Sequence, residues 1–503
     1  MQQNGNAAPA PVSSNRDSRS VPRVLIIGAG IGGLCMAIQL KRAGFANFAV
    51  LEKADGVGGT WHDNSYPGAC CDVPSHLYSF SFEHKSDWSR KFAPQSEILD
   101  YLNHCADKYG IRPHVRFGTE VVAARYDEAA QLWRVRTRGG EELEAEVLVS
   151  AVGQLNRPAY PDIPGREEFA GVSFHSARWR HDHDLTGRTV GVIGNAASAI
   201  QFIPPVAERA ARLHVFQRSP NWMARRRDRA YGERERRRFA RHPHLAKLYR
   251  WSIWARLEAF WPVFARGNRF APLVQGMCLK ELKEQVRDAR LRKVLTPDFP
   301  VGCKRLLISD DYFAALNRDN VEVVTTPIER ITARGVLTAD GVTRELDTLV
   351  YGTGFESTRF LMPMEIRGRG GRELHDAWRS GAEAYLGLCV AGFPNFFILY
   401  GPNTNLGHNS IIFMLECQVH YVMELLHRMV ADGVQAIDVR PEVQAAYNAE
   451  IQASVQRLVW ASDQCSSWYK TEAGKVTNNW PHYTVRYWAQ TRTPDLDAYE
   501  AVG

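Results

Sequence analysis

Short, uninterrupted apolar runs and amphipathic stretches alternate near the start of this chain. Residues 21–27 form an apolar run rich in β-branched side chains, and this run ends at Gly28. Residues 34–43 then have the spacing of a helix, and residues 48–52 form a second apolar run. A strand buried on both faces has a continuous apolar run, so this order predicts a strand, a helix and a parallel strand.

The same order of patterns returns further along the chain. An apolar run at residues 189–194 is followed by a helical pattern at 197–211 and by another apolar run at 213–217. The chain is therefore predicted to contain two α/β units of the same kind, one inserted within the other. Further strands are predicted at 321–324, 345–351 and 396–400, and further helices at 410–432 and 441–458.

Three other regions have different patterns. Residues 95–109 have helical spacing, with a predicted cap at Ser96. Residues 114–150 alternate between apolar and polar side chains in the manner of antiparallel strands. Residues 222–295 are rich in arginine, leucine and aromatic residues at helical spacing, which predicts a helical insertion.

Composition places the chain among ordinary globular proteins. Its 503 residues, 45% hydrophobic and 23% charged, are enough for two or three domains. Residues 1–21 are small and polar, which predicts a disordered tail and no signal peptide. The nine cysteines are scattered apart from Cys70 and Cys71, which favours a reduced, cytoplasmic protein without a metal site. Charged residues interrupt the most apolar helical region, 245–264, so it cannot cross a bilayer unaided.

Positive charge is concentrated in one segment. Between Arg225 and Arg250 there are eleven Lys or Arg residues and three Asp or Glu residues, an excess of eight against a net charge of +7 for the whole chain. Such a block is usually a solvated helix face or a mobile lobe. A patch for nucleic acid or for peripheral contact with an anionic membrane is the minor alternative.

The first glycine motif has the context of a dinucleotide-binding turn. Gly28, Gly30 and Gly33 follow a predicted strand and open a predicted helix. They would permit the tight turn, the approach of a diphosphate to the helix N-terminus and close packing of helix on strand. Glu52 ends the second strand, where a carboxylate can accept hydrogen bonds from both hydroxyls of an adenosine ribose.

A second, less regular motif opens the other unit. It contains Gly194, Asn195, Ala196 and Ser198, with alanine at the position of the middle glycine, and taken alone it also fits an ordinary strand-to-helix turn. Arg218 lies 24 residues after Gly194 (218 − 194), just as Glu52 lies 24 residues after Gly28 (52 − 28). A carboxylate repels a ribose 2′-phosphate, whereas a guanidinium pairs with one. The two units are therefore predicted to bind FAD and NADPH, respectively.

Three longer motifs resemble those of class B flavoprotein monooxygenases, and within them the type I Baeyer–Villiger monooxygenases. The segment 58–72 matches the pattern [AG]-G-x-W-x4-[FY]-P-[GM]-x3-D at every fixed position. Residues 352–355 (GTGF) resemble the later Gly-x-Gly-Phe segment of that family. A linker motif, F-x-G-x3-H-x3-W, is matched by Phe169, Gly171, His175 and Trp179; Arg180 then departs from the family's Pro or Asp.

The resemblance covers roughly residues 22–490 and implies roles for individual residues. Arg305 resembles the arginine that reaches over the flavin, Asp72 the aspartate that positions it, and Lys304 a lysine that helps to hold the NADPH 2′-phosphate. His175 resembles a histidine that couples domain motion to turnover. The remaining residues implied to bind a cofactor are Gly59, Thr60, Trp61, Tyr78 and Trp468.

Each of these residues also has a plain structural explanation. Arg305 fits a charge on a surface loop, Asp72 a turn residue, and His175 a buried structural histidine. Trp61 and Tyr66 fit a hydrophobic core. Their positions within a fully matching motif, rather than their residue types, favour the functional roles.

The activity implied is oxidation of a hydrophobic ketone to an ester or lactone by NADPH and O2, through a C4a-peroxyflavin. An N- or S-oxidising flavin monooxygenase is the nearest alternative, but Trp179 and the Lys304–Arg305 pair argue against it. An uncoupled NADPH oxidase or reductase, and a non-enzymatic FAD-holding redox sensor or interaction protein, also remain open. The ketone can be linear, cyclic or aryl. A set of aromatic residues fits either an access route or helix packing: Trp251, Trp254, Phe260, Trp261 and Phe264.

These observations together predict the domain organisation. The tail is followed by the first part of the FAD-binding domain at 22–155. The NADP-binding domain covers 156–354, with its helical insertion at about 222–300, and the second part of the FAD-binding domain covers 355–503. The predicted fold class is thus α/β, with two Rossmann-like dinucleotide-binding domains, one inserted in the other.

Overall fold

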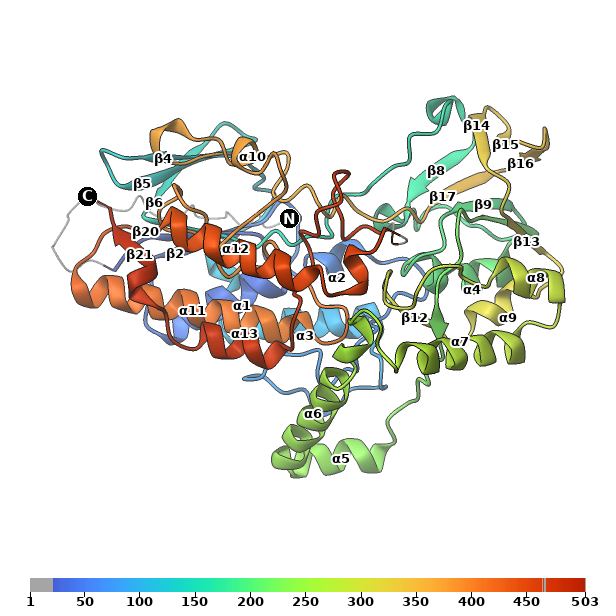
Figure 1. Cartoon of the computed structure of the whole chain (residues 1–503), viewed down its shortest axis with the longest axis horizontal. Coiled ribbons are helices and arrows are strands. Elements are labelled where there is room, and N and C mark those ends of the chain that lie inside the picture. The colour runs from blue at the N-terminus through green and yellow to red at the C-terminus, as the bar shows by residue number, and fades with distance from the viewer. Residues whose placement is uncertain (1–20, 464, 466, 503) are drawn as a thin grey trace, which may run out of the picture.

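The structure is a computed structural model that describes residues 21–463, 465 and 467–502. Residues 1–20 of the predicted disordered tail lie outside the described residues. Two parallel sheets dominate the fold, one at the left and one at the right in Figure 1. Helices α5 and α6 project below both of them (Figure 1).

The first sheet has five parallel strands in the order β19-β7-β1-β2-β3. Every residue of β1 and β7 is buried, as expected for central strands covered on both faces. Helix α1 follows β1 directly and packs against α3 and α11. The bounds are β1 Val24–Ile27, α1 Ile31–Arg42, β2 Phe48–Leu51, α3 Gln95–Lys108, β3 Val115–Arg116, β7 Val147–Ser150, β19 Phe396–Ile398 and α11 Ile411–Asp432.

The second sheet repeats this architecture with five parallel strands in the order β13-β10-β9-β17-β8. Helix α4 follows β9, the central strand, as α1 follows β1. The bounds are β8 Val172–His175, β9 Thr189–Ile193, α4 Ala199–Arg209, β10 Arg212–Phe216, α9 Tyr312–Leu316, β13 Val321–Val324 and β17 Thr348–Tyr351.

Smaller sheets and helices complete the two units. A four-stranded sheet has the order β18-β4-β5-β6, and β14, β15 and β16 form an antiparallel meander. These strands are β4 Val121–Asp127, β5 Leu132–Thr137, β6 Glu142–Ala145, β14 Ile328–Thr332, β15 Gly335–Thr338, β16 Thr343–Glu345 and β18 Glu365–Arg367. Two-stranded pairs are β11 Met223–Ala224 with β12 Leu307–Ile308 and β20 Ile437–Val439 with β21 Tyr499–Ala501. Outside residues 222–300, the other α-helices are α2 Thr60–Asp63, α10 Leu374–Ala377, α12 Pro441–Val455 and α13 Thr484–Thr491.

The region predicted as a helical insertion is helical. It contains α5 Glu233–Arg241, α6 Pro243–Glu258, α7 Ala271–Gln285 and α8 Ala289–Val294. Helix α5 has no buried residue, whereas α6 buries Arg250 and Glu258 on one face.

Two local predictions differ from the structure. Helix α3 begins at Gln95 after the N-cap Pro94, and no side chain caps it, so the predicted cap at Ser96 is wrong. Within the region 114–150, predicted to form antiparallel strands, β3 and β7 instead belong to the parallel sheet. β3 pairs with β2, and β7 pairs with β1 and β19 on either side. Pairing between distant segments decides the direction of a strand, and the local pattern does not record it.

Candidate functional site

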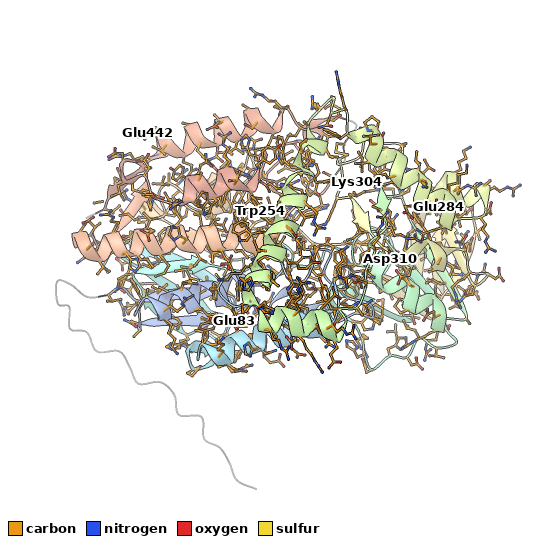
Figure 2. All side chains as sticks on the ribbon, turned by 90° about the horizontal axis from the view of Figure 1, so that it is seen from below. Glu83, Trp254, Glu284, Lys304, Asp310 and Glu442 are labelled. Atoms are coloured by element: carbon orange, nitrogen blue, oxygen red, sulfur yellow. A yellow bond between two sulfur atoms is a disulfide. The ribbon has the colours of Figure 1, made fainter. Side chains whose placement is uncertain are left out.

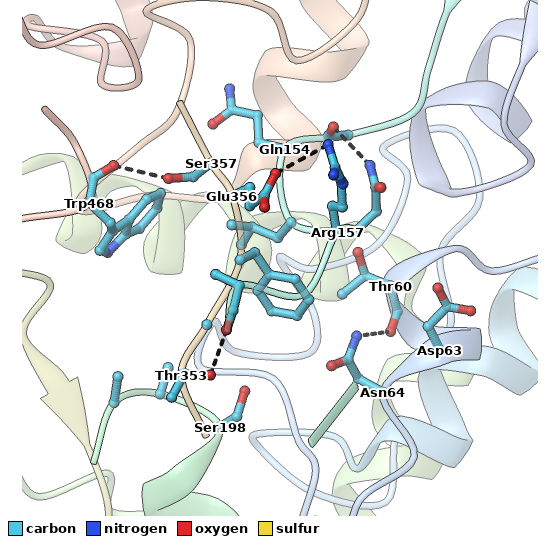
Figure 3. A pocket seen from close by; sticks show the side chains of 18 of the residues that line it. Thr60, Asp63, Asn64, Gln154, Arg157, Ser198, Thr353, Glu356, Ser357 and Trp468 are labelled. Atoms are coloured by element: carbon cyan, nitrogen blue, oxygen red, sulfur yellow. Dashed lines mark hydrogen bonds and ion pairs between the residues drawn. The ribbon is translucent and has the colours of Figure 1, made fainter. Parts of the chain in front are cut away.

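A cavity of about 1840 Å³ is lined by residues of both α/β units. Figure 3 looks into part of it, with Trp468 and Ser357 on one side and Thr60 and Asp63 on the other. The predicted site residues in its lining are Gly28, Gly30, Glu52, Gly59, Thr60, Trp61, Asp72, Tyr78, Gly194, Asn195, Ala196, Ser198, Arg218, Lys304, Arg305 and Trp468.

The first glycine turn leaves no room for side chains at Gly28 and Gly33. Gly28 has φ +102°, and a Cβ there would lie 2.8 Å from the carbonyl oxygen of Ala151. A Cβ on Gly33 would lie 1.8 Å from the carbonyl oxygen of Gly28. Gly33 therefore lies behind the cavity wall and lets α1 begin directly against β1. Gly30 and Gly59 lie side by side at the N-terminus of α1, where their backbone leaves space for a diphosphate.

Glu52 is buried at the end of β2 beside this turn. Its carboxylate accepts hydrogen bonds from the backbone N–H of Ala29 at 2.6 Å and of Ala54 at 2.9 Å. These bonds fix the carboxylate at the cavity wall. A carboxylate has lone pairs beyond those two, so it can also accept hydrogen bonds from ribose hydroxyls.

The second turn has the same shape. Gly194 has φ +110°, and a Cβ there would lie 2.3 Å from the carbonyl oxygen of Gly352. The side chain of Asn195 donates to Gln217 Oε1 at 3.0 Å. Ala196 is exposed to the cavity in front of α4, so its methyl group narrows the space where a diphosphate would bind.

Two cations and a hydroxyl lie together beyond the end of β10. Lys304 Nζ donates to Ser219 Oγ at 2.9 Å and lies over the ring of Phe299. Burial, and secondarily the nearby charge of Arg218, lowers the pKa of Lys304. A phosphate bound between these cations would offset their mutual repulsion, so the set fits a ribose 2′-phosphate.

Asp72 and Arg305 form an ion pair, with Oδ2 and Nη2 2.6 Å apart. The Asp72 carboxylate raises the pKa of Arg305 above its usual value, while burial opposes this rise. Tyr469 lies near the pair, and burial raises its pKa to about 12. The site therefore combines a permanent cation with a phenol that remains protonated.

The segment that carries Asp72 is attached to both units. Trp61 Nε1 donates to Tyr78 Oη at 3.1 Å within the first unit. Gln201 of α4 accepts hydrogen bonds from Tyr66 Oη at 3.1 Å and from Cys70 N at 3.2 Å, and its Nε2 donates to Cys70 O at 3.1 Å. This segment thus links the two nucleotide-binding turns.

The linker-motif residues are outside the described lining of the cavity. His175 is buried and its Nδ1 accepts from Ala177 N at 3.1 Å. Burial lowers the pKa of His175 to about 4, so the ring is neutral near pH 7. A Cβ on Gly171 would lie 2.6 Å from both the ring of Phe169 and the carbonyl oxygen of Asp347, so the two motif residues pack closely together.

Trp179 packs within the second unit. Its ring is 5.1 Å from that of Phe174 and 5.4 Å from that of Phe202, measured between centroids. Arg180, which departs from the family pattern, forms an ion pair with Asp182 at 2.6 Å on the surface. The departure therefore changes a surface position and leaves the packing of Trp179 in place.

The C-terminal segment closes another wall of the cavity. The carbonyl oxygen of Trp468 accepts a hydrogen bond from Ser357 Oγ at 3.0 Å (Figure 3). The ring of Trp468 lies 4.5 Å from that of Tyr469. An aromatic wall next to the Asp72–Arg305 pair can exclude water from the reacting atoms.

The expectation of reduced cysteines is wrong for one pair. Cys303 and Cys465 form a disulfide across 162 residues of sequence. Cys303 directly precedes Lys304, and Cys465 lies three residues before Trp468. The disulfide thus joins two segments that line the cavity. The two cysteines are so far apart in the sequence that their spacing did not indicate the pairing.

Several residues at the site had no sequence prediction. Ser219 follows Arg218 directly and could have been found by that position. Tyr400 lies in the cavity wall near Arg305. Neither Gln201 nor Tyr400 had a local signal, because both reach the site through the packing of distant elements. Within the described part of the chain, no group of acidic, histidine or cysteine side chains could hold a metal ion. Among the described helices, none is long and apolar enough to span a membrane.

Comparison with known proteins gives the same assignment as the geometry. Residues 25–235 match the family described as pyridine nucleotide-disulphide oxidoreductase. The chain is 43% identical over 478 residues to a Baeyer–Villiger monooxygenase of Pseudomonas aeruginosa, covering 95% of this chain and 91% of that protein. This chain belongs to the Baeyer–Villiger monooxygenases.

Solved structures share the fold over nearly the whole chain. The crystal structure of OTEMO in complex with FAD and NADP has a TM-score of 0.85 at 30% identity, covering 95% of this chain and 99% of that one. Closed cyclohexanone monooxygenase has a TM-score of 0.86 at 28% identity, with the same coverage. The predicted family, the fold class and the class of enzyme, a flavin-dependent NADPH monooxygenase, are confirmed.

Proposed function

We propose that this Baeyer–Villiger monooxygenase oxidises a hydrophobic ketone to an ester or lactone, with Arg305 and Asp72 at its reaction centre. The reaction would draw its electrons and activated oxygen from NADPH, bound FAD and O2. The Asp72–Arg305 ion pair, 2.6 Å long in the wall of a cavity shared by both units, is the observation that carries this proposal.

The residues of the first unit fit FAD. Gly28, Gly30 and Gly59 would accommodate the diphosphate at the N-terminus of α1, and Glu52 would accept hydrogen bonds from the ribose hydroxyls. Thr60, Trp61 and Tyr78 would line the flavin end. We keep 22–155 and 355–503 as the proposed bounds of this domain, and 156–354 as those of the NADP-binding domain.

The residues of the second unit fit NADPH. Arg218, Lys304 and Ser219 would hold the 2′-phosphate, and Asn195, Ala196 and Ser198 would surround the diphosphate. Trp468 would close over the nicotinamide. His175, buried against the rings of Tyr160 and Phe355, would transmit movement between the two domains without acting as a base.

Arg305 is suited to stabilising negative charge on a reacting oxygen. Oxygen transfer to a ketone carbon passes through a tetrahedral adduct with charge on the former carbonyl oxygen. A fixed guanidinium stabilises such charge without reorganisation, and Asp72 holds it in place and keeps it protonated. One carbon substituent would then migrate to the transferred oxygen while the O–O bond breaks, which re-forms the C=O bond of the ester. The second oxygen atom of O2 would leave as water.

The deciding experiment compares purified FAD-loaded wild-type protein with an Arg305→Ala variant on a panel of ketones. NADPH and O2 consumption are measured together with ester formation by mass spectrometry. We expect ester yield to match NADPH use in the wild type. We expect a loss of at least about a hundredfold in the variant while FAD stays bound, which is typical of removing one charge-stabilising donor.

The matched control is Arg138→Ala, which removes another cavity-lining arginine that pairs with a carboxylate, Glu120. This variant should keep its ester yield. NADPH use that gives only H2O2, or only oxides of amines and sulfides, would contradict the proposal and favour an oxidase or a heteroatom monooxygenase. The ketone panel also identifies the substrate class, and a cytoplasmic location stays a prediction.

A further inference from the structure

Helices α5 and α6 form a hairpin that projects from the rest of the chain (Figure 1). Phe239 of α5 stacks on Tyr249 of α6, with ring centroids 5.4 Å apart, which holds the two helices together. The hairpin contains none of the described residues that line the cavity. Its surface chemistry therefore needs an explanation other than the reaction itself.

Buried polar contacts hold one face of α6 firmly against the first unit. Arg250 donates to the carbonyl oxygens of His76, Leu77 and Ser79 at 2.9–3.0 Å. Glu258 accepts from Thr484 Oγ1 at 2.9 Å, at the start of α13. A charged side chain satisfied in this way is costly to displace. Leu248 lies two residues from Arg250, on roughly the opposite side of the helix, so its side chain is held outwards.

The outward face of α6 and the adjoining face of α13 expose large apolar side chains. Leu248 is 62% exposed, Trp251 57% and Trp488 42%. Trp251 packs edge-on against Trp254, whose Nε1 donates to Thr484 Oγ1 at the start of α13. Figure 2 shows Trp254 on the underside of the molecule. We define the apolar strip as Leu248, Trp251, Tyr483, Val485 and Trp488.

Unpaired positive charge lies on the same hairpin as Leu248 and Trp251 of the apolar strip. In the described part of the chain, none of four side chains of the hairpin forms an ion pair: Arg234, Arg238, Arg241 and Lys247. All four are exposed. We define them as the basic rim. Helix α7 lies above and to the right of the hairpin in Figure 1, and Phe270, which precedes it, is exposed together with Leu273 and Met277. Exposed apolar side chains are therefore not confined to one helix.

We propose that the apolar strip and the basic rim dock this protein on the surface of an anionic lipid bilayer. Tryptophan and tyrosine favour the interface between headgroups and acyl chains, and arginine and lysine pair with anionic headgroups. The contact is peripheral: the strip enters the headgroup region while the two nucleotide-binding units stay in water. A second copy of this chain would bring a surface of the same positive charge, which disfavours self-association through this face.

The experiment is sedimentation of the FAD-loaded enzyme with lipid vesicles. Vesicles of pure phosphatidylcholine are compared with vesicles that also contain phosphatidylglycerol, at low and high salt. We expect sedimentation with the anionic vesicles at low salt and release at high salt, because salt screens the charges of the rim. The neutral vesicles should retain much less protein.

Two variants test the two parts of the surface. Arg238→Gln with Arg241→Gln should lower the partition coefficient about fivefold per charge removed. Leu248→Ser with Trp251→Ser should lower it about tenfold or more, because large apolar side chains no longer enter the interface. Val342→Ser and Arg318→Gln are the matched controls: both residues are exposed on the second unit, away from the hairpin, and their removal should change nothing.

NADPH oxidation by each variant, measured without vesicles, shows whether the variant is folded and contains FAD. This measurement does not depend on lipid binding. The proposal is overturned if the folded wild type fails to sediment with anionic vesicles. Equal sedimentation with neutral vesicles, or equal losses in the control variants, would also overturn it. A third result would also overturn it: the wild type is a dimer in solution, and the strip variants are monomers that bind vesicles as the wild type does. The strip would then be covered by a second copy.

Discussion

Glu52 and Arg218 lie beyond the second strand of their respective units, each 24 residues after the first glycine of its turn. Glu52 is buried and fixed by two backbone N–H groups. Arg218 is exposed to the cavity near Lys304. Ribose hydroxyls need an acceptor and a 2′-phosphate needs a cation, so the carboxylate of Glu52 suits FAD and the guanidinium of Arg218 suits NADPH.

Replacing Arg218 by glutamine is expected to raise KM for NADPH about ten- to a hundredfold, the range for losing a charge-assisted hydrogen bond. KM for NADH, which has no 2′-phosphate, should change little. Steady-state kinetics with both coenzymes measure the effect. Arg212→Gln is the control, since Arg212 is an exposed arginine at the opposite end of β10. Equal rises in KM for both coenzymes would show that Arg218 supports the fold rather than the phosphate.

At the scale of elements, the segment that carries Asp72 is docked on α4 of the other unit. Gln201 contributes three hydrogen bonds to Tyr66 and Cys70. Gly68 lies so close to α4 that a Cβ there would be 2.3 Å from the carbonyl oxygen of Gln201. The position of Asp72 therefore depends on contact between the two units.

Replacing Gln201 by leucine should keep the volume of the side chain and remove these bonds. We expect FAD to stay bound and a larger fraction of NADPH use to yield H2O2, because Asp72 and Arg305 are no longer held firmly. The ratio of H2O2 to NADPH consumed gives the measurement. Gln285→Leu in α7, whose amide bonds only within its own helix to Glu281, is the control. An unchanged ratio in Gln201→Leu would mean that the docking does not position Asp72.

At the scale of the whole molecule, the Cys303–Cys465 disulfide joins two residues that are 162 positions apart in the sequence. A cross-link of this span restricts the unfolded chain strongly. It also attaches the segment of Trp468 to the segment of Lys304 and Arg305, which come from distant parts of the chain. Among the residues that the structure describes, seven cysteines are free, and six of these are buried.

Replacing both cysteines by serine is expected to lower the free energy of unfolding by about 2–5 kcal/mol. Denaturant unfolding of the FAD-loaded protein, with and without a dithiol reductant, measures the difference. Reductant should destabilise the wild type and leave the double variant unchanged. In denaturant without reductant, seven of the nine cysteines should react with a thiol reagent. Nine reactive thiols would show that the disulfide is absent from the purified protein.

The sequence by itself determined the two parallel sheets, the two glycine turns and the family. Buried parallel strands can be recognised from local apolar runs. Glycine turns can be recognised from glycines at positions where a Cβ would clash, as at Gly28 and Gly194. The opposite charges of Glu52 and Arg218 are likewise visible at fixed spacing. Those features need no knowledge of distant residues.

Only the tertiary structure decided the direction of β7, the contact of Gln201 with the segment of Asp72, and the Cys303–Cys465 disulfide. Each of these joins residues that are far apart in sequence, so neither periodicity nor spacing carries a signal for it. The apolar strip is the same kind of feature. The sequence favoured packing of Trp251 within a helical lobe over an access route. In the structure Trp251 is 57% exposed on α6, the helix that Arg250 and Glu258 anchor on distant segments.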